Sequence, residues 1–326
     1  MPTPMPSPFV SIIIPCFNGR DCVGDAIQSA VDQTYANKEV IVIDDGSTDD
    51  SLAVIQGFGD KIRWETGPNR GGAAARNRGL SLARGEFIQF LDADDVLDPR
   101  KLEEQVPVLQ AGGADVIYSD WIQYHADRPS QKWLCSVPHP SGDSVILALA
   151  RQNITTEAPV HRKGILTGIG GFRADLPCCQ ERDLHLRQAC HGARFRHLPR
   201  VLHTVRLRRG SVSDDEQRVI GWMRTLLSER YAELQGRGDL TEARKVAFAT
   251  LMAAQGRVLL RYGDRPKAME YFADARRMHP GGGLPGAYGR LGSWLTRLLG
   301  LPATESLLGQ VRKMKAGVKS AFSRTA

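Results

Sequence analysis

Three aspartates, Asp92, Asp94 and Asp95, stand within four positions of one another, directly after a short apolar run. Like charges this close repel each other unless protons or a cation relieve the repulsion. Their hard oxygen atoms suit Mg²⁺ or Mn²⁺, and these ions usually hold substrate phosphates as well. The cluster therefore indicates either a divalent cation that bridges a diphosphate or a solvated loop, in which Asp98 would cap a helix that starts at Pro99.

A second acidic pair, Asp44 and Asp45, precedes Gly46 and Ser47 at the end of another apolar run. A carboxylate there can accept a hydrogen bond from a base N–H or a ribose hydroxyl, and Gly46 lets the backbone turn tightly near a ligand. An ordinary strand-to-helix turn, with Ser47 or Thr48 capping the helix, would use the same residues.

These clusters need elements that position them, and residues 10–119 alternate the patterns of strands and helices. Strands are predicted at 10–15, 39–43, 62–65, 87–91 and 115–118, and helices at 21–33, 48–58, 73–83 and 99–110. Strands separated by single helices predict an α/β fold with a mostly parallel, doubly wound sheet, whose ligands bind beyond the carboxyl ends of the strands. Because 15–18, 44–47 and 92–95 all follow strands, we expect them to share one site.

The rest of the chain departs from this alternation. Residues 120–215 mix tryptophans, prolines and short strands, and we expect them to complete one domain over 1–215. Helical patterns dominate from about Asp214, and 257–280 indicate a helical hairpin within an extension over 216–280. After a glycine-rich break, apolar residues at helical spacing predict an amphipathic helical tail over 281–326.

The charge of the chain is concentrated in that tail. The whole sequence carries 43 basic and 36 acidic residues, and residues 281–326 hold seven of the basic and one of the acidic ones. Such a tail suits peripheral contact with an anionic membrane leaflet, or packing on the body or on a partner. It lacks the aromatic platform on which single-stranded nucleic acid stacks, so nucleic acid is not an expected partner.

Other features of the sequence bear on the cellular compartment in which the protein is expected. No run of 18 apolar residues occurs, and residues 1–9 lack the basic and apolar regions of a secretory signal. The six cysteines show no zinc-site spacing, which favours reduced thiols. We therefore expect a cytoplasmic protein, with the inner face of the membrane as a peripheral location.

Four motifs follow one another in a fixed order: SIIIPCFN at 11–18, VIVIDDGSTD at 40–49, GGAAARNRG at 71–79 and FLDADD at 90–95. Their combination resembles the family 2 glycosyltransferases, which have a GT-A fold, over about residues 8–215. Neither GxGxxG nor GxxxxGK[ST] occurs, which disfavours dehydrogenases and kinases.

The resemblance implies roles for individual residues. The first two motifs, Arg76 and the acidic loop would bind the nucleotide sugar, with Asp45 contacting the base. Arg78 is an alternative to Arg76 in this role. The other interpretation of both arginines is that they lie on a solvated helix face. Asp94 and Asp95 would hold Mg²⁺ or Mn²⁺, and Asp92 completes the Asp-x-Asp pattern of the family. The residues implied in donor binding are Pro15, Phe17, Asn18, Asp44, Asp45, Arg76, Asp92 and Asp94.

The family also places an acidic pair after a Gly-Gly-Phe stretch, which is 170–172 here. The usual Glu-Asp is replaced by Gln180-Glu181, so that Glu181 would be the catalytic base that takes the proton of an acceptor hydroxyl. Asp183 is expected to be structural, as a helix cap or the partner of an arginine. A structural Glu181 in a protein that does not turn over is the alternative.

A second departure from the family lies at Arg208, where an Arg-x-His-x-Gly-Ser segment often carries its histidine. The replacement removes a possible metal or phosphate contact, although an arginine can bind diphosphate oxygens directly.

The resemblance implies an inverting, metal-dependent transfer of a sugar from a nucleotide diphosphate sugar to a hydroxyl. A UDP-sugar is the favoured donor, and the acceptor is expected on a cell-surface glycan or a lipid-linked precursor, as in polysaccharide biosynthesis. The alternative is an inactive nucleotide-sugar-binding or scaffold protein.

Overall fold

The computed structural model describes residues 7–208 and 215–280, together with the single residues Tyr288, Thr304 and Leu308. The chain divides into two compact units. The first comprises the chain up to residue 148 and residues 152–216, and the second comprises residues 149–151 and the chain from residue 217 onward. The predicted basic tail over 281–326 lies outside the described residues, apart from the three single positions.

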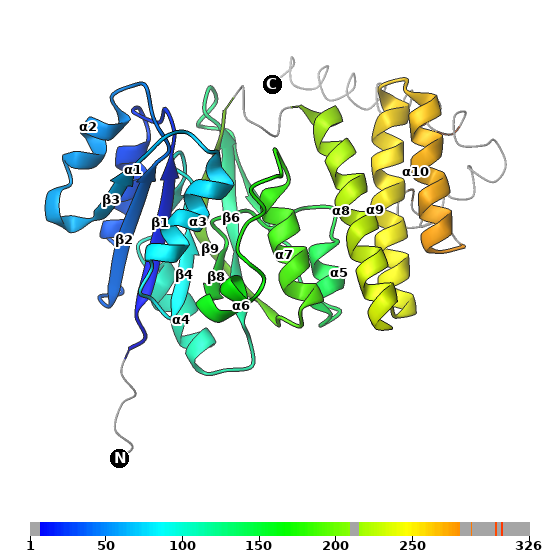
Figure 1. The fold of residues 1–326 in the computed structure, drawn as a ribbon, viewed down its shortest axis with the longest axis horizontal. Helices are drawn as coiled ribbons and strands as arrows, with labels where there is room; N and C mark the ends of the chain where they lie inside the picture. Colours follow the sequence, from blue (N-terminus) through cyan, green and yellow to red (C-terminus); the bar gives the residue numbers. More distant parts are fainter. Residues whose placement is uncertain (1–6, 209–214, 281–287, 289–303, 305–307, 309–326) are drawn as a thin grey trace, which may run out of the picture. The chain divides into compact units, whose positions relative to one another are not determined.

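The first unit is built on a mixed sheet, whose described part has nine strands (Figure 1). Their bounds are β1 (Val10–Cys16), β2 (Lys38–Asp44), β3 (Arg63–Thr66), β4 (Phe87–Phe90), β5 (Val96–Leu97), β6 (Val116–His125), β7 (Lys132–Cys135), β8 (Pro159–Arg162) and β9 (Phe195–Leu207). The order is β3-β2-β1-β4-β8-β6-β9-β5, with β7 paired to β6. Strands β3, β2, β1 and β4 are parallel as predicted, whereas β8 runs antiparallel to both β4 and β6.

Helices cover both faces of this sheet (Figure 1). Their bounds are α1 (Val23–Val31), α2 (Ser51–Gln56), α3 (Gly72–Leu82), α4 (Lys101–Gln110), α5 (Ser144–Ala148), α6 (Lys163–Gly168) and α7 (Gln180–Cys190). Successive residues of β1 enter different cores: Ile12 and Ile14 pack with α1 and α4, and Ile13 packs with α3 and α7. Because both faces are covered, β1 is apolar throughout rather than alternating.

The start of α2 differs from the prediction. The helix begins at Ser51, and neither Ser47 nor Thr48 caps it. Both residues bond instead to the loop after β1: Ser47 Oγ accepts from the N–H of Asn18 at 2.9 Å, and the Thr48 N–H donates to Asn18 Oδ1 at 2.8 Å. The prediction was wrong because these polar residues have a partner that is distant in the sequence.

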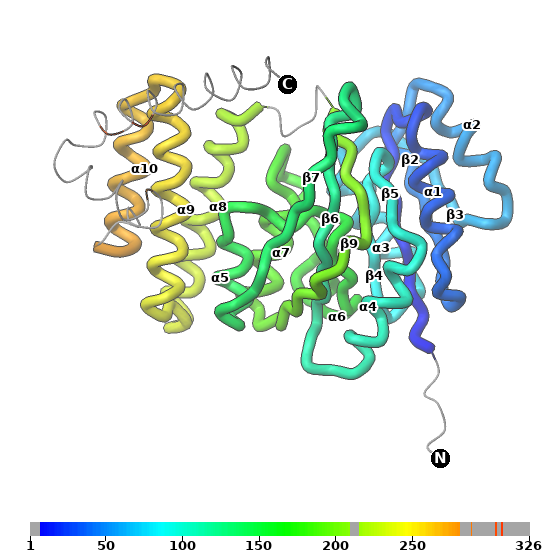
Figure 2. The backbone as a smooth tube through the Cα atoms, turned by 180° about the vertical axis from the view of Figure 1, so that it is seen from behind, coloured from blue at the N-terminus to red at the C-terminus, as the bar shows by residue number. Residues whose placement is uncertain are grey.

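The second unit contains α8 (Glu216–Arg237), α9 (Glu242–Arg261) and α10 (Arg265–Met278), as Figure 2 shows. Helices α9 and α10 form the predicted hairpin, and Asp264 Oδ1 caps α10 by accepting from the Lys267 N–H at 3.1 Å. Arg224 of α8 pairs with Glu270 and Asp274 of α10 at 2.7 and 2.6 Å. Within the described residues, no helix has both the length and the apolar composition needed to cross a bilayer.

Candidate donor and acceptor site

The loops after β1 and β2 lie against each other. The two strands are parallel and in register from Val10 and Lys38 to Cys16 and Asp44, and the Asp45 N–H donates to the Cys16 carbonyl at 2.8 Å. Carboxyl ends of neighbouring parallel strands meet at one edge of the sheet, so the bonds between Asn18 and 47–48 close this edge. The structure thus brings the first two predicted clusters together.

Asp44 and Asp45 are adjacent in sequence but bond to different parts of the unit. The Asp44 carboxylate is buried, and it accepts from Thr66 Oγ1 at 2.6 Å and from the Ser47 N–H at 3.2 Å. Asp45 accepts from the backbone N–H groups of Arg70 and Gly71, at 2.9 and 2.8 Å. Asp44 therefore joins the ends of β2 and β3, and Asp45 anchors the chain that leads into α3.

Gly46 is required by the shape of this turn. Its φ is +76°, in the region that favours glycine, and a Cβ at this position would lie 2.8 Å from the backbone nitrogen of Asn69. Of the other residues at this edge, Pro15 is buried within β1, whereas half of the Phe17 side chain is exposed. Phe17 is thus the aromatic group of the loop that a flat ligand can reach.

The three aspartates between β4 and β5 have three different environments. Asp95 is buried and accepts from the Arg206 N–H at 2.8 Å. The side chain of Asp94 is 39% exposed, and its Oδ2 lies 3.8 Å from Arg208 Nε. Burial, then the neighbouring Asp92, raises the pKa of Asp94, and burial and Asp94 raise that of Asp95 well above its usual value.

Glu157, a further carboxylate of this cluster, was missed in the sequence. It is buried, it accepts from the Asp92 N–H at 3.4 Å, and it lies within hydrogen-bonding reach of Asp95. Burial, then Asp95 and Asp92, raises its pKa well above the usual value. Glu157 precedes β8, and the antiparallel pairing of β8 with β4 brings the start of β8 to the end of β4. Because no local pattern gives the direction of β8, the sequence held no signal for Glu157.

Arg76 of α3 connects the acidic loop to the start of α7. Its side chain is only 12% exposed; it forms an ion pair with Asp92, and its Nη1 donates to Gln180 Oε1 at 3.2 Å. Its guanidinium also lies over the Phe172 ring, 5.3 Å from the centroid. Burial by itself would lower the pKa of Arg76, but Asp92 and the nearby Glu157 and Glu181 raise it. One buried cation thus faces carboxylates from three separate stretches.

Arg78, the alternative to Arg76, takes a different direction. Its Nε and Nη2 donate to the two carboxylate oxygens of Glu65 on β3, at 2.7 and 2.9 Å. More than half of its side chain is exposed. This geometry matches the solvated helix face that the sequence left open for Arg78.

Glu181 is the second residue of α7, where the unpaired N–H groups of a helix favour negative charge. Its Oε1 accepts from Asn153 Nδ2 at 2.8 Å. Asp183, by contrast, is fully buried and paired with Arg187 at 2.7 Å and with Arg173 at 3.8 Å. The expected structural role of Asp183 is confirmed.

The predicted metal ligands are Asp94 and Asp95. Among the described residues, no group of three or more His, Cys, Asp or Glu side chains is arranged to hold a metal ion. Asp94 offers partly exposed oxygens, and after burial the neighbouring carboxylates Asp92 and Asp94 raise the pKa values of Asp94 and Asp95, respectively, so that several acidic groups lie close together. These residues therefore fit a hard divalent cation that takes its remaining oxygens from substrate and water.

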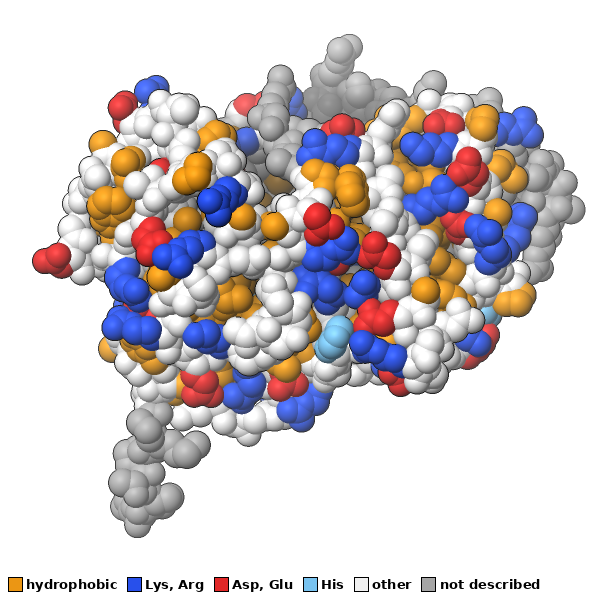
Figure 3. Space-filling view, viewed as in Figure 1, with side chains coloured by type: hydrophobic (Ala, Val, Ile, Leu, Met, Phe, Trp, Pro, Cys, Tyr) orange, Lys and Arg blue, Asp and Glu red, His pale blue; other side chains and the backbone are white. Residues whose placement is uncertain are grey.

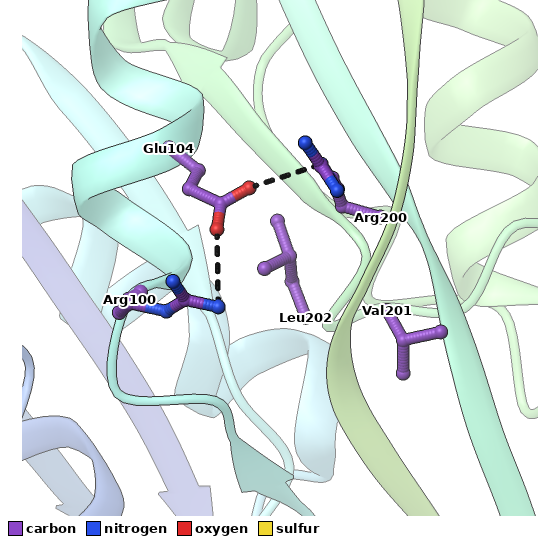
Figure 4. Close-up of a pocket in the computed structure, with 5 residues that line it drawn as sticks. All are labelled: Arg100, Glu104, Arg200, Val201 and Leu202. Carbon is purple, nitrogen blue, oxygen red and sulfur yellow. Dashed lines mark ion pairs between the residues drawn. The ribbon is translucent and has the colours of Figure 1, made fainter.

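A separate hollow lies between α4 and β9 (Figure 4), and it is lined by Arg100, Glu104, Arg200, Val201 and Leu202. Glu104 pairs with both arginines at 3.7 Å. The hollow contains none of the predicted site residues. On the face shown in Figure 3, acidic and basic side chains are interspersed, in keeping with the nearly equal acidic and basic content of the chain before its tail.

Several known proteins are similar to parts of this chain. Residues 11–167 match the family model described as Glycosyl transferase family 2. An uncharacterized glycosyltransferase, RP339 of Rickettsia prowazekii (strain Madrid E), is 43% identical over 103 residues, which are 32% of each chain. The glucosyltransferase WfgD of Escherichia coli, named as acting from UDP-Glc on α-D-GlcNAc-diphosphoundecaprenol, is 38% identical over 114 residues, 34% of this chain and 45% of WfgD. The chain thus spans less than half the length of these relatives.

Two solved structures have a similar fold. TarS 1–349 of S. aureus, in complex with UDP-GlcNAc, gives a TM-score of 0.67 at 16% identity, covering 94% of this chain and 92% of that one. The mannosyltransferase PcManGT of Pyrobaculum calidifontis, in complex with GDP-Man and Mn²⁺, gives 0.57 at 20% identity, covering 99% and 90%. The predicted fold class is confirmed, and residues 11–167 belong to glycosyl transferase family 2 within a chain of the GT-A fold.

Proposed function

We propose that this protein is an inverting glycosyltransferase that moves a sugar from a nucleotide diphosphate sugar to a hydroxyl acceptor. The observation that carries the proposal is the position of Arg76. It pairs with Asp92 of the acidic loop and donates to Gln180, the neighbour of Glu181. The residues expected to hold the donor and the residue expected to act on the acceptor are therefore linked by one side chain.

The donor would bind across the edge formed by the loops after β1, β2 and β4. Half-exposed Phe17 suits stacking on a base, and Asp45 is held rigidly by two backbone N–H groups. UDP in a TarS complex and UDP-Glc in the name of WfgD support a UDP-sugar as donor. The name of WfgD also supports a lipid-linked acceptor of the kind used to build surface glycans.

Asp94 and Asp95 would hold Mg²⁺ or Mn²⁺, and the Mn²⁺ in the PcManGT complex supports this assignment. Such an ion supplies positive charge to the diphosphate that leaves with the nucleotide. Arg76 keeps Asp92 fixed and compensates its charge, so that the loop retains its shape as substrates enter.

Glu181 would be the base. Asn153 bonds its Oε1, and Oε2 would accept the proton of the acceptor hydroxyl as that oxygen attacks the sugar. Gln180-Glu181 lies beyond the segment that matches the family model, so this assignment depends on its link to Arg76.

The test is nucleoside diphosphate release from a panel of nucleotide sugars, in the presence of Mn²⁺ and candidate acceptors. Glu181→Gln should lower kcat at least a hundredfold, in line with the usual contribution of general base catalysis, and leave donor affinity within about threefold. Glu65→Gln, which changes a carboxylate paired to Arg78, is the matched control and should leave kcat unchanged. Wild-type activity in Glu181→Gln would refute the base, and donor binding without turnover by the wild type would favour the scaffold alternative.

We also propose a cytoplasmic location, with the tail over 281–326 as a peripheral membrane contact and with domain boundaries near 215 and 280. The net charge of the tail supports attraction to anionic lipid. Co-sedimentation of the full chain with vesicles that contain phosphatidylglycerol, compared with a chain ending at 280, tests the contact. Equal binding of both chains would refute it.

A further inference from the structure

Arg208 is a further arginine whose side chain lies at the acidic loop. It follows β9 directly, and the antiparallel pairing of β9 with β5 carries it past the aspartates that precede β5. Its Nε lies 3.8 Å from Asp94 Oδ2, and the side chains of the two residues are 37% and 39% exposed. The thiol of Cys22 also lies within hydrogen-bonding range of Arg208.

Arg76 and Arg208 are held very differently. Arg76 is nearly buried and bonds to both Asp92 and Gln180, so its position is fixed. The separation of Arg208 and Asp94 exceeds hydrogen-bond length, and a half-exposed ion pair contributes little to stability. Arg208 can therefore leave Asp94 at small cost, whereas Arg76 cannot leave Asp92.

Asp94 is also the most exposed of the three aspartates, with 39% of its side chain exposed against 30% for Asp92, whereas Asp95 is buried. A cation bound to Asp94 would repel the guanidinium of Arg208. It would also neutralise the negative charge of Asp94, which attracts that guanidinium in the absence of the cation. The nearest new negative charge would be the diphosphate beside that cation. A guanidinium remains protonated and presents five N–H donors in a planar fork that matches phosphate oxygens.

We propose that Arg208 is a diphosphate-binding residue that exchanges Asp94 for the phosphate oxygens of the donor when Asp94 takes up a cation. The inference rests on the proposed function, because it needs a nucleotide diphosphate at the acidic loop. It assigns two effects of opposite sign to one side chain: Arg208 competes with the cation for Asp94 and strengthens the binding of the nucleotide.

The experiment measures two affinities in the full chain, by calorimetry for nucleotide and by the electron paramagnetic resonance signal of free Mn²⁺ for the metal. UDP, GDP and dTDP are titrated at saturating Mn²⁺, and Mn²⁺ is titrated without nucleotide. The variants are Arg208→Ala and Arg208→Lys, with Arg78→Ala as a control that removes one positive charge from the Glu65 pair. Circular dichroism and thermal unfolding verify that each variant is folded.

Loss of a charge-assisted contact should weaken binding of the preferred nucleotide about ten- to a hundredfold in Arg208→Ala, and less in Arg208→Lys, while Arg78→Ala stays within threefold. Because Arg208→Ala removes the guanidinium that competes for Asp94, this variant should bind Mn²⁺ about two- to fivefold more tightly than the wild type. Unchanged nucleotide affinity in Arg208→Ala overturns the diphosphate contact, and unchanged Mn²⁺ affinity overturns the exchange. If the wild type binds none of the three nucleotides, the proposed function itself fails.

Discussion

The link between Arg76 and Asp92 predicts a measurable coupling energy. Arg76 and Asp92 are 12% and 30% exposed, so water screens their ion pair only in part. Arg76→Met should cost about 3 kcal/mol, because it leaves Asp92 unpaired and removes the bond to Gln180. Asp92→Asn should cost about 2 kcal/mol, because the buried guanidinium loses its charged partner.

The double variant isolates the interaction of the two side chains. The double variant should lose less unfolding free energy than the two single variants lose together. The difference should be about 2 kcal/mol, which is the contribution of a charge-assisted hydrogen bond. Urea unfolding followed by tryptophan fluorescence measures it, because Trp64, Trp121 and Trp133 all lie in the first unit. Strict additivity, within about 0.5 kcal/mol, would refute the reasoning that Arg76 and Asp92 act as a pair.

Two further predictions concern residues that support the site. Gly46→Ala should destabilise the first unit by more than about 1 kcal/mol and weaken UDP binding, because φ is +76° and the added Cβ meets Asn69; unchanged thermal unfolding would contradict the strain. Lys101 is fully buried, donates to the Ala158 carbonyl at 2.9 Å, and has its pKa lowered to about 7 by burial. The unfolded chain therefore binds more protons than the folded one between about pH 7 and 10. Over that range, the free energy of unfolding should rise with pH, and Lys101 should contribute at most about 1.4 kcal/mol per pH unit to that rise. Lys101→Met should remove that dependence in urea unfolding at pH 7, 8 and 9, and parallel wild-type and variant curves would disprove it.

Local sequence was sufficient where an element depends on its own residues. The apolar run of β1 predicted the place of that strand, because a strand with both faces buried must be apolar throughout. Polar residues that end parallel strands must then gather at one edge, and the bonds among Asn18, Ser47 and Thr48 confirm this for the first two loops. The predicted donor and metal contacts at that edge stay predictions.

Only the tertiary structure decided which carboxylates and cations face each other. Glu157 lies 65 positions from Asp92, and Gln180 lies 104 from Arg76. Strand β8 enters the sheet antiparallel beside β4, and no local pattern states the direction or the neighbour of a strand. Asp44 and Asp94 follow similar apolar runs, yet their environments differ. Asp44 is buried and bonded to Thr66, whereas Asp94 is partly exposed beside Arg208. The sequence by itself determined which residues could do the chemistry, whereas their partners depend on contacts between segments far apart in the chain.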